Sequence, residues 1–273
     1  MSVDLSRLSL NQKTLNGWTL PQAVEGCVRA GIPWIALWRD KVEETGLEES
    51  ARIVHDAGIK VSSLCRGGMF PSPTPEGRAA NIEDNKRAID EAATLGTDVL
   101  VMVCGGLSGV RAIDDARGMV RDGIEAILPY AEQRGVKLGI EPLHPAFAAD
   151  RSVISLLGEA NDLAEHFRSP QVGVVIDIYH VWWDPNVYTE IARASQYTLG
   201  FHVNDWLVPN TDPLMSRGMM GDGVVQNRRL REAVDTAGYT GPIEVEIFNQ
   251  DIWRKDGDDV LLTMKERFVQ EVM

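Results

Sequence analysis

Residues 99–142 read VLVMVCGGLSGVRAIDDARGMVRDGIEAILPYAEQRGVKLGIEP, and this stretch indicates how the chain folds. It begins with the apolar run VLVMVC (99–104), continues with the amphipathic segment AIDDARGMVRDGIEAILPYAEQRG (112–135), and ends with a second short run, KLGIEP (137–142). Short apolar runs of this length favour buried strands, whereas the longer segment favours a helix. Gly135 is a typical helix stop directly before the second run. The pattern predicts a strand, a crossover helix and a parallel second strand.

The same alternation continues on both sides of this stretch. The other predicted strands are SRLSLN (6–11), PWIALW (33–38), KVSSLC (60–65), VGVVID (172–177), TLGFHV (198–203) and IEVEIF (243–248). Amphipathic segments at 19–31, 46–58 and 81–96 lie between strands and end in Gly31, Gly58 and Gly96. Repeated strand–helix units of this kind are typical of a parallel sheet covered by helices.

Eight such units favour a closed barrel over an open doubly wound sheet. A length of 273 residues is normal for a βα barrel, and no Gly-x-Gly-x-x-Gly turn follows the first strand as a dinucleotide fold requires. We therefore predict a single (β/α)8 TIM barrel over residues 1–273, with the active site at the C-terminal ends of strands five to eight. The long irregular segment 206–223 is expected to be functional or mobile.

Composition narrows the class of protein further. Hydrophobic residues make up 44% and charged residues 25%, and the formal net charge of -13 argues against nucleic-acid binding, which needs clustered Lys and Arg. Cys27, Cys65 and Cys104 have neither zinc-site spacing nor an even count, and so we expect reduced, buried thiols. The first residues, MSVDLSRLSLNQ, hold no apolar run of signal-peptide length, and no stretch is long enough to span a membrane. We expect a cytoplasmic protein with no membrane partner.

Four consecutive predicted strands end in residues that bind metals. The fifth strand ends in Glu141, the sixth in Asp177, the seventh in His202 and the eighth in Glu246. Alone, a strand glutamate usually faces solvent, and a single histidine at a strand end is usually structural. Together, these four residues bring three negative charges to the C-terminal end of the barrel, with no Lys or Arg beside them on their strands. Burying such charges is costly unless they are paired or bind a cation. We predict one divalent metal ion, with Mn²⁺ first and Mg²⁺, Co²⁺ or Zn²⁺ as alternatives.

Five short motifs lie in the last four predicted strands and the segments next to them: Glu-Pro-Leu at 141–143, Ile-Asp-x-Tyr-His at 176–180, Phe-His-Val-Asn-Asp at 201–205, Gly-x-Gly at 221–223 and Gly-Pro-Ile-Glu-Val-Glu at 241–246. These motifs resemble those of the xylose isomerase-like barrels, a family that includes sugar phosphate isomerases, ketose 3-epimerases and inosose dehydratases.

The resemblance covers essentially the whole chain and implies roles for particular residues. It implies that Glu141, Asp177, His202 and Glu246 hold the metal, and that Glu141 and Glu246 also act as acid and base. It further implies that His180 contacts substrate and that Arg217 binds substrate oxygens. Members of this family are commonly dimers or tetramers, so a homo-oligomer is expected. The family includes isomerases, epimerases and lyases, and so the resemblance leaves the reaction open.

Four more residues are predicted to take part at the mouth. Trp38 and Trp206 are expected to stack on a sugar, although packing of long loops is the simpler role for any one Trp, and Asp205 is assigned to substrate binding. His144 stands where related epimerases have a non-basic polar residue; it serves as an acid or base in an elimination, or it merely orders its loop.

The charge of the loop after the seventh strand bears on the substrate. Arg217 could form an anion nest with Gly218, Gly221 and Gly223, but Asp212 and Asp222 in the same loop favour neutral hydroxyls over a phosphate. Arg39 and Arg66 are weaker candidates for substrate binding, with loop salt bridges as the alternative.

These observations predict a metal-dependent isomerase or epimerase that moves a proton next to the carbonyl of a ketose or keto-sugar. The alternative is a metal-dependent lyase or dehydratase that removes water or an aglycone from a 3-keto sugar or inosose. Two further alternatives are an apurinic endonuclease-like enzyme, which needs more histidines and a basic groove, and a non-catalytic sugar-binding barrel. Dependence on a second subunit also stays open.

Overall fold

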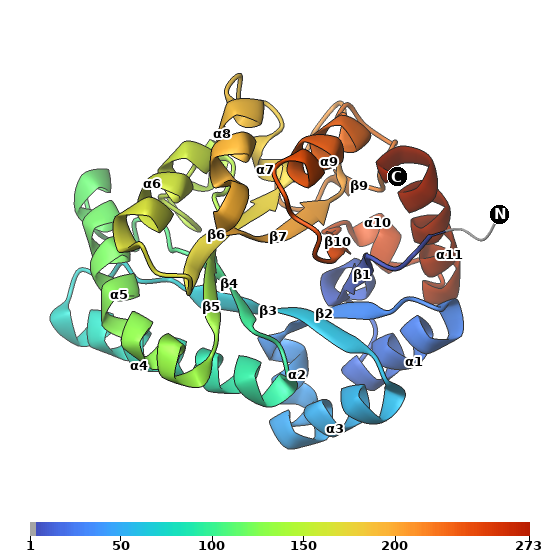
Figure 1. The fold of residues 1–273 in the computed structure, drawn as a ribbon, viewed down its shortest axis with the longest axis horizontal. Coiled ribbons are helices and arrows are strands. Elements are labelled where there is room, and N and C mark those ends of the chain that lie inside the picture. The colour runs from blue at the N-terminus through green and yellow to red at the C-terminus, as the bar shows by residue number, and fades with distance from the viewer. Residues whose placement is uncertain (1–3) are drawn as a thin grey trace.

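The computed structural model describes residues 4–273, which form one closed barrel of parallel strands surrounded by helices (Figure 1). The strands follow one another around the barrel in the order β1-β10-β7-β6-β5-β4-β3-β2, with all neighbouring pairs parallel. The predicted (β/α)8 fold is therefore confirmed. Within the described part of the chain, no helix combines the length and the apolar composition that a membrane span requires.

All eight predicted strands are present, with small shifts at their ends. The barrel strands are β1 (Leu8–Asn11), β2 (Trp34–Trp38), β3 (Lys60–Gly68), β4 (Val99–Val103), β5 (Lys137–Ile140), β6 (Val172–Asp177), β7 (Thr198–Val203) and β10 (Ile243–Val245). Glu141 and Glu246 follow the last residues of β5 and β10, since the ladder ends there. Each still donates its backbone N–H to the neighbouring strand, to the carbonyl of Met102 or Val203, at 3.2 Å. The backbone of both glutamates is thereby held at the barrel rim.

The helices cover the outside of the barrel. Their bounds are α1 (Leu20–Ala30), α2 (Arg39–Thr45), α3 (Leu47–Ala57), α4 (Pro75–Leu95), α5 (Ile113–Arg134), α6 (Leu157–Phe167), α7 (Ile178–Val181), α8 (Val187–Ala194), α9 (Asn227–Thr236), α10 (Gln250–Trp253) and α11 (Gly257–Arg267). The predicted helix ends at Gly31, Gly58, Gly96 and Gly135 are confirmed, because all four adopt the left-handed conformation that glycine accepts without strain. Helix α4 begins at Pro75, earlier than predicted, because Thr74 caps its first turn.

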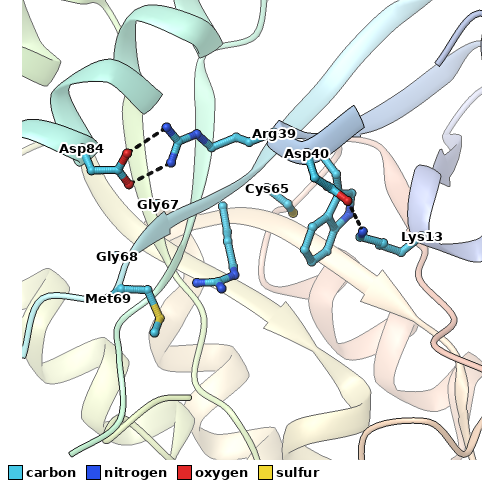
Figure 2. Close-up of a pocket in the computed structure, with 10 residues that line it drawn as sticks. Lys13, Arg39, Asp40, Cys65, Gly67, Gly68, Met69 and Asp84 are labelled. Carbon is cyan, nitrogen blue, oxygen red and sulfur yellow. Dashed lines mark hydrogen bonds and ion pairs between the residues drawn. The ribbon is translucent and has the colours of Figure 1, made fainter. Parts of the chain in front are cut away.

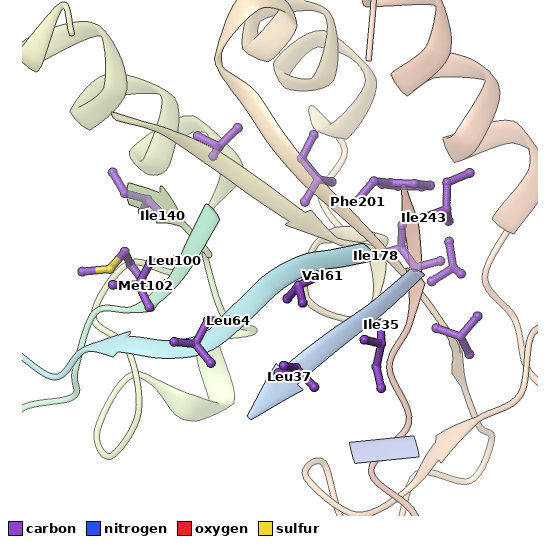
Figure 3. Packing of buried hydrophobic residues seen from close by; sticks show 14 of the residues in the cluster. Ile35, Leu37, Val61, Leu64, Leu100, Met102, Ile140, Ile178, Phe201 and Ile243 are labelled. Carbon is purple, nitrogen blue, oxygen red and sulfur yellow. The ribbon is translucent and has the colours of Figure 1, made fainter. Parts of the chain in front are cut away.

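Alternate residues of each strand point to opposite sides of the barrel wall. Leu100 and Met102 of β4 face outward into the large core between strands and helices, as do Ile140 of β5 and Ile243 of β10 (Figure 3). Val101 points inward, into a small cluster inside the barrel with Cys65 and Val175. The outer layer is apolar throughout, so polar side chains at the intervening positions are directed to the barrel interior.

The long segment predicted to be irregular contains a short antiparallel ladder. Strand β8 (Asp205–Trp206) pairs with β9 (Arg217–Gly218), with Asp205 opposite Gly218 and Trp206 opposite Arg217. This ladder folds the loop back over the barrel mouth and brings Arg217 to the ends of the strands.

Candidate metal centre

The strand register places the predicted metal ligands beside one another. Asp177 of β6 is paired with His202 of β7, and His202 is paired with Glu244 of β10. Because side chains alternate along a strand, Glu246 lies on the same inward face as Glu244. Glu141, which follows outward-facing Ile140, points to the same interior. The alternation and the register together are sufficient to gather the four side chains.

Glu141, Asp177, His202 and Glu246 form one buried cluster. One ligand atom from each lies within 4.8 Å of those from the other three, and every member is buried. His202 Nδ1 is 3.2 Å from Glu141 Oε1 and 3.7 Å from Glu246 Oε2. Three oxygen donors and one imidazole nitrogen at this spacing could hold one metal ion.

The other side of the His202 ring contacts a carboxylate that was not predicted as a functional residue. His202 Nε2 is 3.1 Å from Glu244 Oε2, and both Ser62 and Ser63 donate their hydroxyls to Glu244 Oε1 at 2.8 Å. Asn11 adds donated hydrogen bonds at 3.2 Å to Glu244 and to Glu246. A carboxylate behind a histidine fixes the ring orientation and strengthens the other nitrogen as a metal ligand.

Glu141 and His202 bind protons more strongly than usual in the metal-free cluster. Burial raises the pKa of Glu141 to about 7; the contact with His202 opposes this rise, and the charge of Glu246 adds to it. Burial alone would lower the pKa of His202, but Glu244, Glu141 and Glu246 outweigh it and raise that pKa well above its usual value. A protonated His202 thus supplies part of the positive charge that a cation would otherwise provide.

Asp177 is held in its ionised form. Its Oδ1 accepts hydrogen bonds from the Tyr179 backbone at 2.9 Å and from Asn204 Nδ2 at 2.8 Å, and its Oδ2 accepts one from Arg217 Nη1 at 2.7 Å. Burial by itself would raise the pKa of Asp177, but the charge of Arg217, supported by His202 and by the hydrogen bond from Asn204, outweighs burial and lowers that pKa.

Arg217 enters the cluster from β9 and contacts two of the proposed ligands. Its Nη1 donates to Asp177 Oδ2 at 2.7 Å and to Glu246 Oε2 at 2.8 Å. The guanidinium lies over the rings of Tyr179 and Phe248, at 4.6 Å and 5.0 Å from their centroids. The strands that carry these carboxylates hold no Lys or Arg beside them, as the sequence showed. The basic group comes instead from the folded loop, as Arg217.

Several buried atoms of the cluster lack a well-directed partner within the described chain. They are Glu141 Oε1 and both ring nitrogens of His202, whose contacts with carboxylates are close but do not have the direction of a hydrogen bond. Buried polar atoms are normally satisfied, and a cation at the centre would satisfy the carboxylate oxygen and one imidazole nitrogen together. The donor set and its burial therefore fit a resident divalent metal.

A cavity of about 30 Å³ opens beside the cluster. Glu141, Glu246, His180 and Arg217 line it, together with Trp38, Arg66, Val103, Leu143, Phe147, Arg151, Leu214 and Phe248. His180 Nδ1 accepts a hydrogen bond from the His144 backbone at 3.1 Å, and burial lowers the pKa of His180 to about 3, so the imidazole is neutral. An adjoining pocket of about 340 Å³ shares Trp38 and Arg66 with this cavity. Trp38 is thus at the mouth, as predicted.

Three other predicted residues lie elsewhere. The side chain of His144 accepts a hydrogen bond from Ala146 N at 3.2 Å and stacks on Trp206 at 5.0 Å. Trp206 also packs against Tyr179 and Trp182, and neither His144 nor Trp206 is among the residues that line the cavity.

Asp205 is fully buried and accepts hydrogen bonds from the backbone N–H groups of Trp206, Gly221 and Val225 at 2.8–2.9 Å. In place of the predicted substrate contact we assign Asp205 a role in shaping the loop. His144 and Trp206 likewise form the packed wall behind the cavity.

Sequence reasoning missed Glu244, Asn11, Asn204 and Arg151 as parts of the site. The first three sit on strands or directly after them, and their positions were open to prediction. Glu244 is two residues before Glu246 and therefore shares its face, and Asn11 ends the first strand. Arg151 belongs to the loop between β5 and α6, where no periodicity marks which side chains return to the barrel mouth.

Comparisons with known proteins agree with this architecture. The family model described as xylose isomerase-like TIM barrel matches residues 24–266. The L-ribulose-5-phosphate 3-epimerase UlaE of Salmonella paratyphi A is 26% identical over 203 residues, which cover 72% of this chain and 68% of that protein.

Two solved structures superpose over nearly the whole chain. The crystal structure of a Sinorhizobium meliloti 1021 protein is 48% identical, covers 98% of this chain and 99% of its own, and has a TM-score of 0.96. The IolI protein, solved with a bound zinc atom, is 19% identical, covers 97% of this chain and 98% of its own, and has a TM-score of 0.85. At that identity, the likeness to IolI concerns the fold alone.

Proposed function

Since the chain belongs to the xylose isomerase-like TIM barrel family, we propose that it is a metal-dependent sugar isomerase or epimerase that moves a proton next to the carbonyl of a ketose or keto-sugar. The observation that carries the proposal is the placement of two glutamates. Glu141 and Glu246 belong to the same metal-binding cluster and line the same cavity, so the reacting end of a substrate that enters from the adjoining pocket would meet both carboxylates. Two carboxylates at one carbon are what proton removal and return require.

The ligand set favours Mn²⁺ as the resident ion, because three carboxylates and one imidazole combine hard oxygen donors with a single nitrogen. The IolI protein, which shares this fold, was solved with a bound zinc atom, and this supports the proposal of a divalent ion in this chain. When bound, such an ion would polarise the substrate carbonyl and make the neighbouring C–H bond more acidic.

The side chains of the cavity account for the proton movements. Glu246 or Glu141 takes the proton from the carbon next to the carbonyl, which leaves an enediolate. The other glutamate returns a proton to the opposite face of the same carbon in an epimerisation, or to the neighbouring carbon in an isomerisation. Arg217, 2.8 Å from Glu246 Oε2, places a fixed positive charge where negative charge develops. The neutral imidazole of His180 lines the cavity, but its Nδ1 accepts from the His144 N–H and its Nε2 lies 3.1 Å from Arg217 Nη2, so its contact with substrate stays a prediction.

The elimination alternative drew part of its support from His144 as an acid or base. That ring accepts a hydrogen bond from Ala146 N, stacks on Trp206 and is not among the residues that line the cavity, so this part of the support is weakened. The names of the relatives point the same way, since UlaE is a 3-epimerase. We therefore favour proton transfer without loss of a leaving group.

Product analysis tests this proposal. Mn²⁺-loaded protein is incubated with a panel of ketoses, ketose phosphates and inososes, and the mixtures are analysed by NMR and mass spectrometry. The proposal expects a product of unchanged mass that differs from its substrate at the carbonyl or the adjacent carbon. Loss of water or of an aglycone from any active substrate would instead establish a lyase.

A cytoplasmic homo-oligomer remains a prediction. Size-exclusion chromatography with light scattering measures the oligomeric state directly, and turnover by the purified protein alone determines whether a second subunit is needed.

A further inference from the structure

Two arginines face the cavity from opposite parts of the chain. Arg66 lies on β3 and Arg151 in the loop between β5 and α6, and both line the cavity that contains Glu141 and Glu246. The backbone of Arg151 is fixed, since its N–H donates to Phe147 O and its carbonyl accepts from Gly105 N, both at 2.9 Å. Arg66 lies in β3 between Cys65 and Gly67, both of which pair with β4. Both side chains therefore start from rigid positions.

The neighbouring basic groups already have carboxylate partners. Lys13 Nζ is 2.6 Å from Asp40 Oδ2, and Arg39 contacts Asp84 at 2.9 Å and Glu91 at 2.6 Å, as Figure 2 shows for the Asp40 and Asp84 pairs. Arg217 is likewise engaged by Asp177 and Glu246. The acidic residues of the pocket beside Arg66, Asp40 and Asp84, are thus occupied by other bases.

Arg66 and Arg151 differ from these groups. Within residues 4–273, neither guanidinium forms an ion pair or a side-chain hydrogen bond. Arg66 is half-buried, and its pKa is lowered first by burial and next by the positive charge of Arg151. Two guanidinium groups that are partly desolvated and repel each other are unfavourable by themselves, and an anion between them would remove both penalties.

We propose that Arg66 and Arg151 form an anion subsite that binds a phosphate or carboxylate group of the substrate. This inference rests on the proposed function and narrows its substrate class to anionic sugars, either phosphate esters or sugar acids. The guanidinium fork matches both groups, since each offers two oxygens to a pair of parallel N–H donors. The adjoining pocket of about 340 Å³, which shares Arg66 with the cavity, has room for the end of the substrate that carries the charge.

The prediction of neutral hydroxyls weighed Arg217 against the acidic residues of its own loop and treated Arg66 only as a weaker candidate for substrate binding. In the folded protein Arg217 serves the carboxylates of the cluster, and the unpaired cations come from other elements. The net charge of -13 does not oppose such a subsite, because the local pair of guanidinium groups determines the field inside the cavity.

Direct binding of simple anions tests the subsite independently of turnover. The affinity of the full-length protein for inorganic phosphate and, separately, for malonate is measured by isothermal titration calorimetry. The same titrations are made with Arg66→Gln, Arg151→Gln and the matched control Arg121→Gln. Arg121 lies on the exposed side of α5 beside Asp122, neither residue lines the cavity or the adjoining pocket, and the substitution makes the same change in net charge.

We expect the wild type to bind phosphate, malonate or both in a saturable manner. Tighter binding of phosphate indicates a sugar phosphate as substrate, and tighter binding of malonate indicates a sugar acid. Each cavity variant should weaken that binding at least about tenfold, because a hydrogen-bonded ion pair is lost. The Arg121→Gln control should bind like the wild type. Because Arg66 is part of a barrel strand, thermal melting checks that its variant folds, and Arg151→Gln in the loop provides an independent test.

Absence of saturable binding to the wild type, or unchanged affinity in both folded cavity variants, would overturn the subsite. Turnover of the sugar panel tests the proposed function separately from anion binding. Turnover of neutral ketoses that is indifferent to both substitutions keeps the isomerase and rejects the subsite. Anion binding that depends on both arginines, in a protein that turns over none of the panel, keeps the subsite and rejects the isomerase.

Discussion

His202 has a carboxylate beside each ring nitrogen, Glu141 at Nδ1 and Glu244 at Nε2. In the metal-free protein this arrangement favours a protonated ring. A nitrogen that binds a metal must present a free lone pair to it. Nδ1 is the ring nitrogen that faces Glu141 and Glu246, two of the other proposed ligands. We infer that Nδ1 binds the ion and that Nε2 keeps its proton for Glu244.

This arrangement predicts that metal affinity rises with pH. The pKa of Glu141 is raised to about 7 and that of His202 is raised well above its usual value, so the metal-free protein holds protons that the ion must displace. Lowering the pH strengthens that competition, and raising it removes the competition. Titration of Mn²⁺ from about pH 6 to about pH 8 should show increasing affinity, with proton release measured in buffers of different ionisation enthalpy. Affinity that is independent of pH would contradict the assignment.

Glu244→Gln tests the carboxylate behind His202. The variant keeps the size of the side chain but loses the charge that orients and polarises the imidazole. Metal affinity should fall about 10- to 100-fold, although Glu244 is not among the four proposed ligands. Equilibrium dialysis with Mn²⁺ measures the change. The exposed Glu232→Gln serves as the control for loss of one carboxylate, and equal losses in both variants would rule out a specific role.

Glu246→Gln tests the proposed acid–base pair. The amide cannot accept a proton from carbon, whereas the barrel and the other three ligands remain in place. The value of kcat should fall by at least about 10²-fold while thermal unfolding of the metal-free protein stays within a few degrees of the wild type. A folded, metal-bound Glu246→Gln variant that retains turnover would count against this role.

At the scale of elements, the loop that contains β8 and β9 positions Arg217. Asp205 holds the loop by accepting three backbone hydrogen bonds, and Gly223 passes so close to the β8 backbone that an added Cβ would lie 2.1 Å from Trp206 O. The Arg217 backbone joins this ladder to the end of β10 through Phe248 O at 3.2 Å. The loop therefore acts as a fixed part of the site.

Asp205→Ala should disturb the site without removing any side chain that lines the cavity. Three backbone N–H groups, one of them fully buried, lose their acceptor, so the free energy of unfolding should decrease by about 2 kcal/mol and kcat should fall because Arg217 is displaced. Chemical denaturation and steady-state kinetics measure the two effects. Asp212→Ala on the exposed part of the same loop is the matched control. Wild-type kinetics for Asp205→Ala would show that the loop does not position the site.

Strands and helix ends were predictable because their causes are local. Alternating polarity identified the strands, and the glycines at Gly31, Gly58, Gly96 and Gly135 identified helix ends. The same alternation marks Glu244 as inward-facing, so that residue could have been found. The position of Arg217 and the convergence of Arg66 with Arg151 depend on loops that meet only in the folded barrel, and periodicity carries no information about them.

For the whole molecule, the barrel concentrates negative charge at one place on its axis. Four carboxylates, from Glu141, Asp177, Glu244 and Glu246, meet Arg217 and one imidazole in a buried volume. An added divalent cation would offset two of the three negative charges that remain, and an ion bound only by the folded state stabilises it by mass action. The fold thus supplies a centre whose charge and chemistry are completed by a metal.

Exchange of substrate hydrogen with D₂O, measured on one protein sample before chelation, after chelation and after Mn²⁺ is restored, tests this claim most directly. We expect deuterium to enter the carbon next to the carbonyl of an active substrate, to stop entering when the metal is removed, and to resume when it returns. Metal content should change in parallel, from one ion per chain to none and back to one. Undiminished exchange by fully metal-free protein would contradict a metal-dependent proton transfer at this centre.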